Sequence, residues 1–79
     1  MPPHKNLLFD IGFELLLRAK EAQSDRDHAP KGSGERIFQS GRLMAFNEVV
    51  SLLQQQAEVM GVPLADLRLD GIDPDRDLL

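Results

Sequence analysis

Three aspartates in the C-terminal segment are the side chains best arranged for chemistry. Asp73, Asp75 and Asp77 occupy every second position, and a calcium-binding loop of the EF-hand type begins with this alternation. Leu78 stands where that loop requires its turn glycine, so the match ends there. We therefore expect no metal site. Asp73, Asp75 and Asp77, together with Leu78 and Leu79, are instead interpreted as helix-capping residues and as a candidate surface for a partner protein.

Two other patterns in the polar middle of the sequence are weaker. Residues 31–34, Lys-Gly-Ser-Gly, would suit an anion at the start of a helix, but the complete phosphate-loop pattern is absent and no strand precedes them. His4 and His28 lie in polar segments without a third ligand at a useful spacing. We expect neither catalytic residues nor a cofactor, and thus no enzyme.

Arg42 and Gln56 are unusual because they interrupt an otherwise apolar arc of a long helix. They are fourteen residues apart and lie on one line along that helix. A buried arginine needs a carboxylate, for which Glu14, or Glu48 or Glu58 of a second chain, is available. Both side chains either extend from the edge of the interface into solvent, or specify the register of a helix bundle, or form a polar pocket at a subunit interface for a small anionic ligand.

The helix that positions Arg42 and Gln56 spans residues 35–60, and its apolar arc covers roughly 200°, about twice what one neighbouring helix requires. One stripe of the arc consists of Phe38, Ala45, Val49, Leu52 and Val59. The other consists of Leu43, Phe46, Val50, Leu53, Ala57 and Met60. We assign this second stripe to a dimer interface. Ser33 or Ser40 is the candidate N-cap, and Gly61 followed by Pro63 predicts the C-terminal end.

The remaining elements are predicted from apolar spacing and from turn residues. An earlier helix is expected over residues 6–22, although the strict alternation at 9–15 also fits a strand. Residues 1–5 are expected to be disordered, residues 23–34 to form a flexible connector, and residues 61–79 to form an acidic tail whose leucines strap the bundle. The fold class is therefore all-α: a two-helix hairpin with a C-terminal strap, in a single small domain that dimerises into a four-helix bundle.

Composition limits the partners and the compartment. The chain has 79 residues, no cysteine and a net charge of −4, with five aspartates against two arginines after residue 60. An acidic surface argues against nucleic acid, and no run of about 18 uncharged apolar residues is present to span a membrane. We expect a cytoplasmic protein whose partners are a second copy of itself and an unidentified protein.

Residues 38–58, FQSGRLMAFNEVVSLLQQQAE, and the segment 70–79, DGIDPDRDLL, resemble a small bacterial family of short helical-hairpin proteins with no assigned activity. The resemblance implies a bacterial cytoplasmic origin and supplies no site residues. The leading hypothesis is a non-enzymatic homodimeric interaction module. The alternatives are RNA binding in the manner of the plasmid repressor Rop, which is also a dimer of helical hairpins, and small-ligand binding at the subunit interface.

Overall fold

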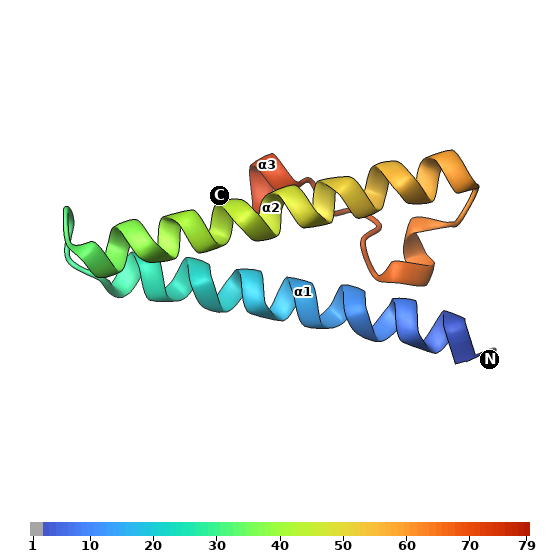
Figure 1. The fold of residues 1–79 in the computed structure, drawn as a ribbon, viewed down its shortest axis with the longest axis horizontal. Coiled ribbons are helices and arrows are strands. Elements are labelled where there is room, and N and C mark those ends of the chain that lie inside the picture. Colours follow the sequence, from blue (N-terminus) through green and yellow to red (C-terminus); the bar gives the residue numbers. More distant parts are fainter. Residues whose placement is uncertain (1–2) are drawn as a thin grey trace.

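The computed structural model describes residues 3–79, with side chains from Asn6 onward, and shows two long antiparallel helices (Figure 1). Helix α1 spans Pro3–His28 and α2 spans Gly34–Met60. A 3-10 helix, η1 (Leu64–Leu67), and a short helix, α3 (Pro74–Asp77), follow. No strand occurs among the described residues, so the all-α hairpin prediction is confirmed and the strand alternative for residues 9–15 is wrong.

Helix α1 is longer than the sequence pattern indicated. It includes residues 3–5, which were expected to be disordered, and it continues to His28 rather than ending near Ala22; residues 1–2 lie outside the described part. The predicted connector 23–34 therefore shrinks to residues 29–33. Beyond Ala22 the helix contacts the end of the chain: the Gln23 amide donates to the Leu79 carbonyl at 3.2 Å and the Arg26 guanidinium donates to it at 3.4 Å.

Local capping fixes both ends of α2. Ser33, rather than Ser40, is the N-cap, and its Oγ accepts from the backbone N–H of Arg36 at 3.1 Å. At the other end Gly61 adopts a left-handed conformation with φ of 70°. The N–H of Val62 then reaches the Ala57 carbonyl at 2.8 Å, which closes a Schellman-type stop. The predicted end of the helix is confirmed.

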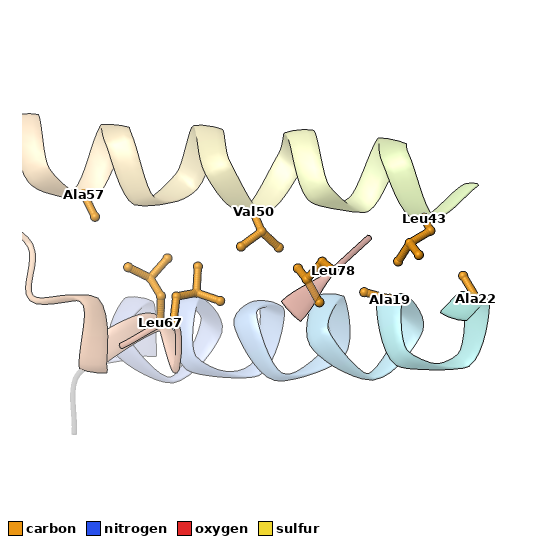
Figure 2. Packing of buried hydrophobic residues seen from close by; sticks show 8 residues of the cluster. Ala19, Ala22, Leu43, Val50, Ala57, Leu67 and Leu78 are labelled. Atoms are coloured by element: carbon orange, nitrogen blue, oxygen red, sulfur yellow. The ribbon is translucent and has the colours of Figure 1, made fainter. Parts of the chain in front are cut away.

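The core lies between the two helices and is widest at one end (Figures 1 and 2). Near the connector, the fully buried Ala19 and Ala22 have little volume and let α2 approach α1 closely. At the opposite end η1 lies between the diverging helices. There Gly12 of α1 is buried directly beneath the Leu67 backbone carbonyl, where a Cβ atom would overlap it. Glycine thus permits the contact that seats η1 on α1.

The segment after η1 forms a strap over the hairpin, which we define as residues 68–79. Leu69 and Leu78 are fully buried, and the side chain of Leu78 lies between the helices (Figure 2). The Gln54 amide of α2 donates to the carbonyls of Leu69 at 3.2 Å and Ile72 at 2.8 Å. Because two of its leucines are buried and two of its backbone carbonyls accept hydrogen bonds from α2, the strap is part of the folded domain.

Candidate functional site

The stripe that sequence analysis assigned to a dimer interface lies mostly inside the chain. Leu43, Val50 and Ala57 are at most 5% exposed and face α1 (Figure 2). Phe46 and Leu53 are half-buried against the same core, and only Met60 is largely exposed. This assignment is therefore corrected for every residue of the stripe except Met60: the others form the seam of the hairpin, because Ala19 and Ala22 of α1 and the buried leucines of the strap pack on them.

The other stripe of α2 is the one that faces away from the rest of the chain. Phe38 is 63% exposed, Leu52 55% and Val59 81%, while Val49 and Ala45 are also exposed. Adding the two polar interruptions gives alternating steps of four and three residues over three heptads, at the positions Phe38, Arg42, Ala45, Val49, Leu52, Gln56 and Val59. This spacing is the seam of a coiled coil. We call these seven residues the heptad stripe.

The strap leaves the heptad stripe open. Asn47, which donates to the Asp75 carboxylate at 3.4 Å, and Gln54 are the α2 residues that bond to the strap. At about 100° per residue they lie on the opposite side of α2, about 180° from the centre of the stripe. The strap therefore covers a different face of the hairpin, and the stripe remains exposed along nearly all of α2.

Arg42 and Gln56 do not form a pocket within one chain. Fourteen residues place them about 21 Å apart along the helix. The Arg42 guanidinium lies 5.5 Å from the centre of the Phe46 ring and donates to the Gln39 side chain at 3.3 Å. Glu14, one suggested partner, instead forms an ion pair with Arg18. Among the described side chains no carboxylate neutralises Arg42, so its charge lies at the edge of the apolar stripe.

Gln56 borders an apolar groove of about 200 Å³ that sequence reasoning missed. The groove opens where α1 begins and α2 ends, between Leu8 of α1 and Leu53 and Met60 of α2. Val62 and Leu67 line its remaining side. Only tertiary structure reveals it, because Leu8 of α1 is distant in sequence from the other wall residues. The exposed Met60, 73% accessible, was the one local signal.

The tail residues proposed as a partner surface are largely engaged in the chain itself. Asp73 caps α3 by accepting from the backbone N–H of Asp75 at 3.1 Å, and Leu78 is buried. Asp77 pairs with Arg76 at 2.8 Å and accepts from the backbone N–H of Asp73 at 3.0 Å. The hydrogen bond from Arg76, supported by the one from Asp73, lowers the pKa of Asp77 well below its ordinary value.

Leu79 is 45% exposed, and its carbonyl accepts a hydrogen bond from Gln23 of α1. Within the described residues no group of three or more His, Asp or Glu side chains is arranged to hold a metal ion. Nor is any helix of the described part long and apolar enough to cross a membrane. We take the heptad stripe and the groove beside it as the candidate site, because exposed apolar side chains and an apolar hollow lie together on this face of α2.

Comparison with known proteins gives no relative from which a role can be transferred. No protein-family model matches the chain, and no similar protein was found among the curated proteins or the solved structures. The bacterial family resemblance expected from residues 38–58 and 70–79 therefore receives no support from these comparisons.

Proposed function

We propose that this protein is a non-enzymatic interaction module that works as a homodimer, in which two hairpins pair through their heptad stripes. The observation that carries the proposal is the exposure of the stripe: Phe38, Leu52 and Val59 are more than half accessible, in a helix whose other seam is already packed within the chain. A four-helix bundle formed by two such hairpins gives each α2 two neighbours, as its two seams require.

The exposed area supports this pairing quantitatively. The apolar side chains of the stripe, with Met60 beside them, leave roughly 500 Å² accessible per chain, near the upper end of what monomeric proteins tolerate. Two copies would bury about 1,000 Å² in total, the size at which specific interfaces begin. Contacts with the flanking side chains of α1 would add to this area, because a second hairpin also lies beside the first helix.

The stripe does not favour the alternative of RNA binding. Arg42 is its single charged residue, whereas binding of a phosphate backbone requires several cations that release counterions. The stripe is instead apolar at five of its seven positions. Burial of apolar area on another protein surface is the driving force that such a face supplies.

A matched pair of substitutions tests the proposal. Leu52→Glu places a charge in the middle of the stripe, and Leu17→Glu places the same charge on a comparably exposed leucine of α1, outside the stripe (55% and 43% accessible). We expect sedimentation equilibrium to show a dimer for the wild type and Leu17→Glu and a folded monomer for Leu52→Glu. Equal dimerisation of both variants would refute the role of the stripe.

A further inference from the structure

The heptad stripe carries a projecting aromatic ring at one end and the apolar groove at the other. Phe38, in the second turn of α2, is 63% exposed although it is a large apolar side chain. The groove lies beside Gln56 and Met60, near the end of the same helix. Eighteen residues separate Phe38 from Gln56, or about 27 Å along the helix axis, so no chain can place its own Phe38 in its own groove.

The two polar residues of the stripe distinguish the two ways in which a second copy could pair with it. In a parallel pair Arg42 would face Arg42 of the other chain, and two like charges would be brought together in an apolar seam. In an antiparallel pair centred on Val49, Arg42 faces Gln56, because each is seven residues from Val49. The guanidinium can then donate to the amide oxygen of Gln56, which gives each of the two polar side chains a partner in the seam.

The same antiparallel arrangement brings the ring and the groove together. Phe38 and Met60 are each eleven residues from Val49, so Phe38 of one chain meets the end of α2 in the other. Met60 forms one wall of the groove there, and Leu8 and Leu53 form others. The groove walls are apolar apart from Gln56 at the edge, which matches the chemistry of a phenyl ring.

We propose that the dimer is antiparallel and that each copy inserts Phe38 into the groove beside Met60 of the other. This inference rests on the proposed function, since it specifies the partner surface of the same stripe. It assigns an occupant to the groove, namely a second copy of this chain. It also gives Arg42 and Gln56 a shared role as a hydrogen-bonded pair that fixes the direction of the two helices.

Spin-label distances test the direction of pairing. The sequence contains no cysteine, so a single substitution introduces one label per chain. Ile37→Cys places labels twelve residues from Val49, and antiparallel pairing separates them by about 36 Å along the axis, whereas parallel pairing leaves only the lateral spacing, ~20 Å or less. Glu48→Cys, next to the centre, should give a short distance in either orientation and serves as the control for pairing.

Substitution of Phe38 tests the occupant of the groove. We expect Phe38→Ala to increase the dissociation constant of the dimer by roughly 10- to 100-fold, because the substitution removes an anchoring ring from each of the two copies. Ile37→Ala, which removes a similarly exposed neighbour outside the stripe (68% accessible), should leave it within a few-fold. Phe38→Ala and Met60→Ala should be non-additive in a double-mutant cycle, because the two side chains touch.

The results of these experiments distinguish the proposed dimer from its proposed antiparallel arrangement. A monomeric wild type would overturn both the dimer and its orientation. A dimer with a short distance between labels at position 37 would retain the proposed function and overturn the antiparallel arrangement. A long distance together with an unchanged dissociation constant for Phe38→Ala would overturn the insertion of the ring into the groove.

Discussion

Replacement of Gly12 by alanine is the substitution whose effect the fold determines most sharply. In an ordinary helix, a glycine in the interior costs up to about 1 kcal/mol relative to alanine, so Gly→Ala is expected to stabilise. At position 12 the new methyl group would overlap the backbone carbonyl of Leu67. A backbone carbonyl cannot rotate aside as a long side chain can, so η1 has to move away from α1.

The magnitude follows from what that movement disturbs. Overpacking of a close contact costs about 1–3 kcal/mol, and displacement of η1 also loosens the burial of Leu67 and Leu69, which are 3% and 0% exposed. After the gain in helix propensity is subtracted, we expect Gly12→Ala to lower the free energy of unfolding by about 1–3 kcal/mol. For a domain of this size, that corresponds to a decrease in Tm of roughly 5–20 °C.

Urea unfolding followed by circular dichroism measures the change, with Gly41→Ala as the matched control. Gly41 is also inside a helix, α2, and a Cβ atom there meets no atom within 4 Å. That control should stabilise the protein by about 0.5–1 kcal/mol. If Gly12→Ala stabilised the protein as much as Gly41→Ala does, the packing of η1 on α1 described above would be incorrect.

Two further predictions concern the strap. Leu78→Ala should destabilise the protein by about 2–4 kcal/mol in urea unfolding, because Leu78 is fully buried, whereas Leu79→Ala, at a position 45% exposed, should cost less than about 1 kcal/mol; similar effects of the two would argue against a docked strap. Because the folded pKa of Asp77 lies below its unfolded value of about 3.9, its stabilising contribution is complete above that pH and is lost as the pH falls below it. The decrease in unfolding free energy between pH 7 and pH 3 should therefore be smaller in Asp77→Asn than in the wild type, and an equal decrease would mean that the interactions of Asp77 with Arg76 and Asp73 do not stabilise the folded state.

Features encoded by neighbouring residues could be predicted from the sequence, and features that depend on distant segments could not. Ser33, Gly61 and Pro63 act within one turn of their own helix. The sequence therefore predicts the end of α2 and leaves two candidates, Ser33 and Ser40, for its N-cap. Residues 23–28 have no apolar periodicity, and two of them, Gln23 and Arg26, donate hydrogen bonds to the last residue of the strap. No local pattern contains that information.

The choice between the two stripes of α2 shows the same limit. Both stripes have helical spacing, so periodicity alone could not tell which of them packs on α1. The strap favours the inner seam, because its buried leucines pack there and because Asn47 and Gln54 bond to it on the side of α2 away from the heptad stripe. The polar residues Arg42 and Gln56 were the one feature of the sequence that distinguished the two stripes. Polar interruptions are tolerated more readily in the stripe that the chain itself leaves exposed.

The solution mass of the wild-type protein, measured by light scattering across a range of concentrations, tests the central claim most directly. Pairing through the heptad stripe predicts a mass twice the 8.8 kDa of the chain at micromolar concentration, decreasing toward 8.8 kDa only on strong dilution. A constant 8.8 kDa up to the highest concentration measured would contradict the account, because the exposed stripe would then have no second copy to cover it.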